Sequence, residues 1–213
     1  MKAAIFDLDG VIVNTVPLHF KAWKRMFSEY GKEFTFEDYK QKVDGIPRTD
    51  GARAILNDLS DEELKKASDK KQVYFLEYLN NEEIPVYNTT VDLIKAIKGE
   101  NLKRGVISSS KNCLSILKRV GLVDLFDVII TGNDVTKGKP DPQVFFMAAE
   151  KMSVEPNLCV VFEDAVLGVE AGKRAGMKCV GIDRYGEPER LKKADLVVAD
   201  LGEVTVEMIK DLF

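Results

Sequence analysis

Near its N-terminus, the 213-residue chain reads Ala3-Ala4-Ile5-Phe6-Asp7-Leu8-Asp9-Gly10, an apolar run followed by two aspartates and a glycine. Its apolar run predicts a short buried strand, and Gly10 lets the backbone turn sharply after it. In an open α/β sheet, ligands bind beyond the carboxyl ends of the strands. Side chains two positions apart in an extended segment point the same way, so the carboxylates of Asp7 and Asp9 can face one small space.

This pair of carboxylates has two interpretations. Neighbouring carboxylates repel each other unless a cation or a shared proton relieves the repulsion. The pair therefore suits a divalent cation with oxygen ligands, with one Asp as nucleophile and the other moving protons. The alternative is structural, because Asp is also common in the turns between strands and helices. The motif alone leaves both open.

Short apolar runs recur along the chain, with helical patterns between them. The alternation predicts an α/β fold with a mostly parallel sheet that helices cover on both faces. Strands are expected at residues 3–6, 105–108, 127–131, 158–162, 179–182 and 196–198. Helices are expected at residues 89–98, 111–120, 142–151, 165–175, 188–194 and 203–212.

Residues 15–81 interrupt this alternation because they contain no convincing strand. Amphipathic patterns predict helices at residues 18–30, 35–43, 50–59 and 61–79, the last with Ser60 as its N-cap. We therefore expect a core domain of residues 1–14 and 82–213 and an inserted helical cap of residues 15–81. An insertion directly after the first strand is well placed to cover the crevice.

Composition restricts the classes of partner. A net charge of −4 and a pI near 5.3 argue against nucleic-acid binding, and no apolar stretch is long enough to span a bilayer. The three cysteines lack metal-ligand spacing, and Cys159 and Cys179 lie in apolar runs. With no signal-peptide pattern before the first strand, we expect a cytoplasmic protein with buried thiols. A monomer is one assembly state that the sequence allows.

Polar residues also follow two further expected strands, each in the corner that leads from the strand into the next helix. Ser108-Ser109-Ser110-Lys111-Asn112 leads from a strand into a helix, where hydroxyls and free N–H groups can bind an anion. Ser108, Ser110, Lys111 and Asn112 are therefore candidate substrate-binding residues. The alternative is a plain serine N-cap.

The second corner is acidic. Glu163 and Asp164 follow the strand at 158–162, and they can complete a cation site with Asp7 and Asp9. The alternative is stabilisation of the next helix by acidic first-turn residues. Two acidic corners matched with a serine-rich third favour one shared site.

A lysine can balance the charge of these carboxylates and of a phosphate. Thr136-Lys137-Gly138-Lys139-Pro140-Asp141-Pro142 places two lysines in a loop after another strand. We favour a functional role for Lys139, which Gly138 and Pro140 constrain, and a surface role for Lys137. The combined residues describe metal-assisted phosphoryl transfer through an aspartyl phosphate, in which Asp9 protonates the leaving oxygen and Ser108 holds the phosphoryl oxygens.

At this point the chain resembles the haloacid dehalogenase superfamily of phosphotransferases. The motifs that carry the resemblance occur in order over nearly the whole chain, and they are Asp7-Leu8-Asp9-Gly10-Val11, Ser108, Lys139-Pro140-Asp141-Pro142 and Glu163-Asp164. The chain is most similar to the beta-phosphoglucomutase branch, through His19-Phe20-Lys21-Ala22-Trp23, Gly45-Ile46-Pro47-Arg48 and the serine-rich corner.

The resemblance implies a Rossmann-like core with a helical cap, and Mg²⁺ bound by Asp7, the backbone carbonyl of Asp9, Glu163 and Asp164. It implies conversion of β-D-glucose 1-phosphate to glucose 6-phosphate through a 1,6-bisphosphate, with catalytic roles for Asp7, Asp9, Ser108 and Lys139. The cap residues that it implies for the sugar phosphate are His19, Trp23, Gly45, Arg48 and Lys71.

Some of these assignments have alternatives. Lys70 can replace Lys71 with a one-residue slip, and Trp23 also suits the core of the cap. Asp44 stands where the best-known mutases have a basic residue, although members associated with disaccharide phosphorylases look similar here. A sugar-phosphate phosphatase needs the same core residues, whereas His19, Arg48 and the cap lysine favour the mutase. A non-catalytic sugar-phosphate sensor is disfavoured because no core catalytic residue is missing, and a dehalogenase would not need Asp9 as a proton donor.

Overall fold

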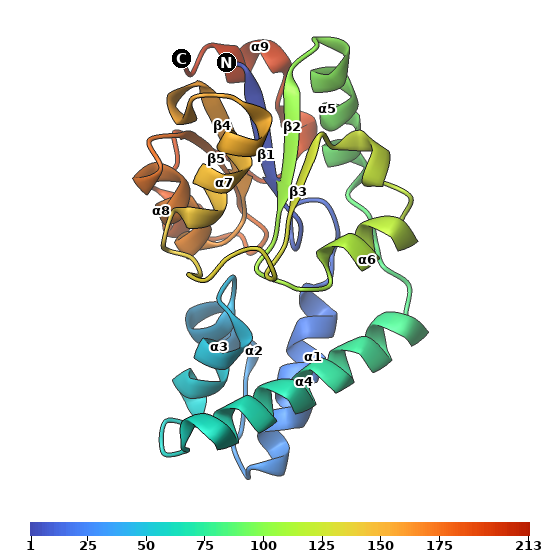
Figure 1. The fold of residues 1–213 in the computed structure, drawn as a ribbon, viewed down its shortest axis with the longest axis vertical. Coiled ribbons are helices and arrows are strands. Elements are labelled where there is room, and N and C mark those ends of the chain that lie inside the picture. Colours follow the sequence, from blue (N-terminus) through green and yellow to red (C-terminus); the bar gives the residue numbers. More distant parts are fainter. The chain divides into compact units, whose positions relative to one another are not determined.

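The computed structural model describes all residues from Met1 to Phe213. The chain forms two compact units (Figure 1). The core unit consists of Met1–Val13 and Val86–Phe213, and the cap unit consists of Asn14–Pro85. Each unit has its own buried apolar cluster and is described separately below.

The core unit contains a six-stranded sheet in the order β3-β2-β1-β4-β5-β6. All five pairings are parallel, which confirms the predicted α/β fold with its parallel sheet. The strands are β1 (Ala3–Asp7), β2 (Lys103–Ile107), β3 (Val128–Ile130), β4 (Cys159–Glu163), β5 (Lys178–Ile182) and β6 (Leu196–Val198).

Strand β1 lies in the middle of this sheet, and the register aligns the carboxyl ends of its neighbours with its own. Asp7 pairs with Ile107 of β2, and Phe6 pairs with Phe162 of β4. The residues that directly follow β1, β2 and β4 therefore meet at one edge of the sheet. This edge carries the polar residues that the sequence singled out.

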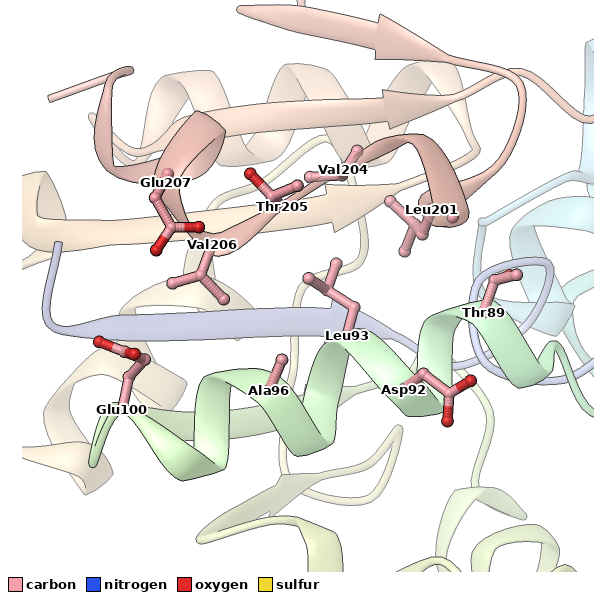
Figure 2. Close-up of a pocket in the computed structure, with 11 residues that line it drawn as sticks. Thr89, Asp92, Leu93, Ala96, Glu100, Leu201, Val204, Thr205, Val206 and Glu207 are labelled. Carbon is pink, nitrogen blue, oxygen red and sulfur yellow. The ribbon is translucent and has the colours of Figure 1, made fainter.

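Helices cover both faces of the sheet. Helices α7 (Gln143–Met152) and α8 (Val166–Arg174) pack on one face in a single apolar cluster with β1 and β4. Helices α5 (Asn88–Gly99) and α9 (Val206–Lys210) contact each other on the other side (Figure 2), and α6 (Cys113–Arg119) follows β2. Short 3₁₀ turns lie at Val123–Leu125, Pro156–Leu158, Pro188–Leu191 and Leu201–Glu203.

Two predicted helices near the C-terminus are wrong in length. The predicted helix at 188–194 is only a 3₁₀ turn, because Asp183 and Asp195 are both bound to the sheet through backbone hydrogen bonds and leave little chain between them. The predicted helix at 203–212 is divided, because the Thr205 side chain accepts a hydrogen bond from Met208 N at 3.2 Å and starts a new helix.

The cap unit is helical, as predicted. Its helices are α1 (Val16–Glu29), α2 (Phe36–Asp38), a π-helical turn (Tyr39–Val43), α3 (Arg48–Ile55) and α4 (Asp61–Asn81). Ser60 caps α4 in a reciprocal capping box with Glu63, so the predicted N-cap is confirmed. Helices α1 and α4 cross and pack against each other (Figure 1).

The three cysteines are buried and unpaired, which confirms the expected buried thiols. Burial raises the pKa of Cys159 to about 11 and that of Cys179 to about 12. Both groups therefore remain protonated near neutral pH, and we assign them no nucleophilic role.

No helix of the structure combines the length and the apolar character that crossing a membrane requires.

A groove of about 450 Å³ runs along α5, opposite the segment that carries Leu201 to Glu207 (Figure 2). Apolar side chains such as Leu93 and Val206 line it together with the carboxylates of Asp92, Glu100 and Glu207. None of its lining residues is one of the site residues predicted from the sequence.

Gly172 lets α8 approach the sheet closely. A Cβ at this position would lie 2.7 Å from Cys179 Sγ and 3.4 Å from a methyl group of Val161. We expect Gly172→Ala to lower the free energy of unfolding by about 1–3 kcal/mol, because the added methyl group overpacks a filled interface. Gly99→Ala is the matched control, since Gly99 is also helical and has open space around it. Urea denaturation of both variants measures the difference, and an equal effect of the two would contradict the close-packing explanation.

Candidate active site

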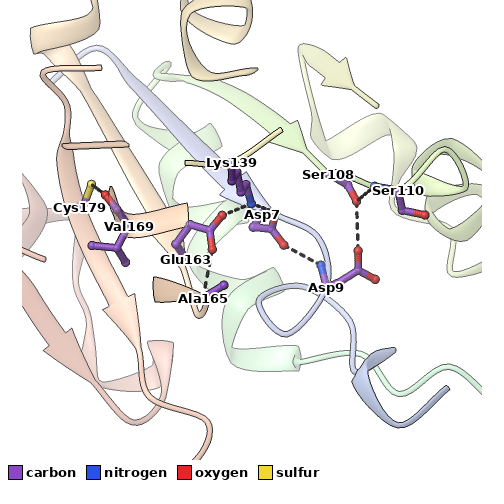
Figure 3. A network of polar contacts seen from close by, with 9 residues as sticks. All are labelled: Asp7, Asp9, Ser108, Ser110, Lys139, Glu163, Ala165, Val169 and Cys179. Atoms are coloured by element: carbon purple, nitrogen blue, oxygen red, sulfur yellow. Dashed lines mark hydrogen bonds and ion pairs between the residues drawn. The ribbon is translucent and has the colours of Figure 1, made fainter. Parts of the chain in front are cut away.

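Asp7 is the last residue of β1 and the centre of a buried polar network (Figure 3). It is 6% exposed. Its Oδ1 accepts a hydrogen bond from Lys139 Nζ at 2.6 Å, and its Oδ2 accepts one from the backbone N–H of Asp9 at 3.0 Å. Both carboxylate oxygens are therefore fixed in direction by donors from two different segments.

Lys139 joins the carboxyl ends of two neighbouring strands. Its ammonium group lies against both Asp7 of β1 and Glu163 of β4, and its side chain is 3% exposed. A buried charged lysine is stable only when it is paired, so the carboxylates of Asp7 and Glu163 allow Lys139 to be charged in this buried position. Of the two lysines in the loop, Lys137 is exposed at the surface and Lys139 is at the site, as predicted.

The charges in this network affect one another strongly. Burial by itself lowers the pKa of Lys139, but Asp7 and Glu163 more than offset that effect and the net pKa is raised, so Lys139 is charged. Burial raises the pKa of Asp7, and Lys139 only partly opposes the rise, while Glu163 and Asp9 add to it. Asp7 is thus short of positive charge around it, and a cation or another donor would favour its ionised form.

Asp9 is connected to the strand β2 corner rather than to Lys139. Ser108 Oγ donates to Asp9 Oδ2 at 3.1 Å, and Ser108 Oγ in turn accepts from the backbone N–H of Ser110 at 2.9 Å (Figure 3). Asp9 is half-buried, in contrast to Asp7. The two aspartates predicted to work together therefore lie in different environments.

The serine-rich corner also contains the predicted residues Ser110, Lys111 and Asn112, which differ in hydrogen bonding and exposure. Ser110 Oγ accepts a hydrogen bond from the backbone N–H of Asn112 at 3.1 Å. The N-cap of α6 is Asn112, without a side-chain capping bond, so the alternative of a plain serine N-cap is wrong for this corner. Asn112 is half-buried, whereas Lys111 is exposed.

Three buried carboxylates could hold a metal ion. Asp7, Glu163 and Asp164 each offer an oxygen within 4.8 Å of the others. With Lys139 included, three carboxylates and one ammonium group carry a net charge of −2 when all are ionised. An all-oxygen donor set with this charge fits a hard divalent cation such as Mg²⁺.

Gly10 keeps the space beside Asp164 open. Its φ is +82°, and a Cβ at this position would lie 1.8 Å from Asp164 Oδ2. Any other residue would thus both strain the backbone and displace a carboxylate of the cluster. The glycine after the two aspartates is required by the site as well as by the turn.

In the cap unit, buried Lys71 and half-buried His19 form a second polar pair. Lys71 is 2% exposed, and its Nζ lies 2.8 Å from His19 Nδ1. An ammonium group has only donors, so Nδ1 accepts and the ring proton resides on Nε2. The Lys71 ammonium also lies 4.9 Å from the Trp23 ring and 5.0 Å from the Phe75 ring, which gives it cation–π partners.

The structure distinguishes between the two candidate lysines of α4. Lys70 points to the surface, where it pairs with Glu29, whereas Lys71 is buried beside His19. Trp23 is 3% exposed and stacks on Phe27 at 5.2 Å, so it belongs to the core of the cap unit and supports Lys71.

Arg48 begins helix α3 and is half-buried. Its Nη1 donates to the backbone carbonyl of Ser68 at 3.1 Å, and burial lowers its pKa. Gly45, three residues earlier, has a φ of +74° in the turn that leads into this helix.

Two residues near these groups were not predicted from the sequence. Phe75 stacks on the His19 ring at 4.1 Å and also faces Lys71; its position one helical turn after Lys71 was the available signal. Arg184 donates from Nε to the Gly10 carbonyl at 2.8 Å. Its signal was its place just beyond the carboxyl end of β5, where ligands of such sheets bind.

Comparisons with known proteins agree with this arrangement. The family model of the haloacid dehalogenase-like hydrolases matches residues 4–182. A beta-phosphoglucomutase of Bacillus subtilis (strain 168) is 35% identical over 218 residues, which cover 99% of this chain and 95% of the relative. A phosphorylated carbohydrates phosphatase of Thermotoga maritima is 34% identical over the full length of both chains.

A solved structure gives the same result for the fold. The crystal structure of beta-phosphoglucomutase from Clostridium difficile superposes with a TM-score of 0.91 at 31% identity, covering 100% of this chain and 96% of that chain. The chain therefore belongs to the haloacid dehalogenase superfamily, in its beta-phosphoglucomutase-like branch.

Proposed function

We propose that the protein is a beta-phosphoglucomutase, which interconverts β-D-glucose 1-phosphate and glucose 6-phosphate through a glucose 1,6-bisphosphate. The observation that carries the phosphoryl-transfer chemistry is the network in which Lys139 contacts Asp7 while Asp9 is held separately by Ser108. The names of the relatives support a sugar phosphate as the substrate.

In this proposal, Asp7 is the nucleophile and Asp9 is the general acid and base. The free electron pair of an Asp7 oxygen attacks phosphorus, and Asp9 gives its proton to the leaving sugar oxygen. An anionic carboxylate must approach an anionic phosphate, so Lys139 is needed to reduce their repulsion. Ser108 and the N–H groups after it hold the phosphoryl oxygens.

The proposed cofactor is Mg²⁺, held by Asp7, Glu163, Asp164 and the backbone carbonyl of Asp9. When bound, it would supply positive charge to the phosphoryl oxygens. The raised pKa of Asp7 and the all-carboxylate donor set support this assignment.

The cap residues support the mutase over a hydrolase. A mutase must bind a substrate with two phosphates in its intermediate, so it needs cationic groups besides Lys139. Arg48 has the planar fork that binds phosphate oxygens in pairs, and Lys71 with His19 supplies a second polar group in the cap. The second candidate function is a sugar-phosphate phosphatase, which the full-length match to a carbohydrate phosphatase favours.

Supplying β-D-glucose 1-phosphate, Mg²⁺ and a trace of the 1,6-bisphosphate tests the proposed function. We expect glucose 6-phosphate to form with little free phosphate, because the phosphoryl group passes to a sugar hydroxyl rather than to water. Both products are measured in the same reaction, with Asp7→Asn as the inactive control. Free phosphate as the main product would identify a phosphatase, and no turnover of any sugar phosphate would reject both functions.

Arg48→Ala tests the role of the cap. We expect it to slow the conversion of β-D-glucose 1-phosphate about tenfold to a hundredfold, the value of one charge-assisted hydrogen bond to phosphate. Hydrolysis of p-nitrophenyl phosphate, which has a single phosphate, should change little. Arg53→Ala is the matched control, because Arg53 lies on the same helix and pairs with Asp61 at the surface. Equal losses in both assays would remove Arg48 from the second phosphate.

A further inference from the structure

Arg184 makes an unusual set of contacts within the core unit. It follows β5, where the backbone N–H of Asp183 bonds to Val198 O at 2.8 Å and fixes the start of the turn. From there its Nε donates to the carbonyl of Gly10 at 2.8 Å, and its guanidinium lies 3.8 Å from the centre of the Tyr87 ring. Its Nη1 lies 3.4 Å from Asp200 Oδ2 and 3.4 Å from the Ala199 carbonyl.

The Gly10 carbonyl is a sensitive place for such a contact. Gly10 directly follows Asp9 in the chain and lies against Asp164. A rotation of the Gly10 peptide group would therefore change the surroundings of the Asp9 and Asp164 carboxylates. The turn is otherwise closed by three backbone hydrogen bonds, from Gly10 N to Val13 O and from Ile12 N and Val13 N to Leu8 O. None of these three bonds holds the Gly10 carbonyl, which leaves that task to Arg184.

Tyr87 brings the segment that returns to the core unit into contact with Arg184 as well. Its backbone N–H donates to Ile12 O at 2.9 Å, and Val13 pairs with Val86 in an antiparallel bridge. The chain leaves the core unit after Val13 and returns at Val86. Arg184 therefore contacts residues on both segments, at Gly10 and at Tyr87.

Stability alone does not explain this residue well. Arg184 Nη2 is buried and has no hydrogen-bond partner in the protein, which costs free energy in the folded state. Packing alone therefore does not account for the position of this guanidinium group.

We propose that Arg184 is a positioning residue for the general acid: its hydrogen bond to the Gly10 carbonyl and its stacking on Tyr87 fix the turn that carries Asp9. This inference rests on the proposed function for the role of Asp9. It does not require a choice between mutase and phosphatase, since both need that acid.

Arg184→Met tests the proposal because it removes the donors and the charge but keeps an unbranched apolar chain in place of the arginine stem. We expect kcat for an alkyl phosphate, glycerol phosphate, to fall about tenfold to a hundredfold, because a misplaced acid cannot protonate a poor leaving group. The fall should be clearly smaller for p-nitrophenyl phosphate, whose leaving group needs little protonation. Arg184→Lys should recover part of the loss, since its ammonium can still donate to Gly10 O.

Arg104→Met is the matched control. Arg104 also binds two backbone carbonyls, of Leu102 and Leu125, and one aspartate, Asp127, but it lies near the amino end of β2. We expect it to lower the melting temperature without altering the ratio of the two kcat values, measured well below the melting temperature of each variant. Equal effects of the two variants on that ratio would overturn the proposal.

Amide hydrogen exchange separates this inference from the proposed function. Arg184→Met should accelerate exchange at Gly10, Ile12 and Tyr87, whereas Arg104→Met should not. Unchanged exchange at these amides would overturn the positioning role even in an active enzyme. Accelerated exchange in a protein that turns over no phosphate ester would retain the structural contact but reject the proposed function, and with it the role assigned to Asp9.

Discussion

The ion pairs of Lys139 with Asp7 and Glu163 are the interaction on which the core unit's site depends. Two carboxylates at the ends of neighbouring strands would repel each other in a buried space, and the ammonium group between them offsets that repulsion. Loss of one partner of such a buried pair leaves an uncompensated charge, which costs about 3–5 kcal/mol. The same charge that allows the carboxylates to be buried together is the one that the proposed reaction uses to bring a phosphate to Asp7.

The sheet explains why these residues meet. Parallel pairing of β1 with β2 and β4 brings Asp7, Ser108 and Glu163 to one edge although they are distant in the sequence. Asp7 and Glu163 end their strands, and Ser108 directly follows β2. Asp7 is enclosed with Lys139, whereas Asp9, two residues later, is half-buried beside Ser108. This difference gives two similar aspartates separate roles in the proposed mechanism.

The parallel fold and the network around Asp7 could be predicted from the sequence, because strand ends carry their chemistry in short contiguous motifs. Long-range contacts between side chains could not be predicted from the sequence. The sequence places Arg184 just beyond the end of β5, but it does not show that this side chain reaches the Gly10 carbonyl. It likewise does not show that Phe75 lies against both His19 and Lys71. The choice between Lys70 and Lys71 also required the structure. A one-residue difference rotates a helical side chain by about 100°, and only the packing of the helix decides which of the two lysines is buried. The helices predicted at 188–194 and 203–212 were too long because anchoring of the chain to the sheet and the Thr205 cap override the apolar pattern.

In the proposed mechanism, Asp7 accepts the phosphoryl group. Incubating the protein with acetyl phosphate and Mg²⁺ and locating the acyl phosphate by mass spectrometry tests this role. The leaving acetate needs no proton, so we expect the wild type and Asp9→Asn both to carry one phosphoryl group on Asp7 and Asp7→Asn to carry none. A phosphoryl group on Asp9, on a serine of the 108–110 corner, or on the Asp7→Asn variant would show that Asp7 is not the nucleophile.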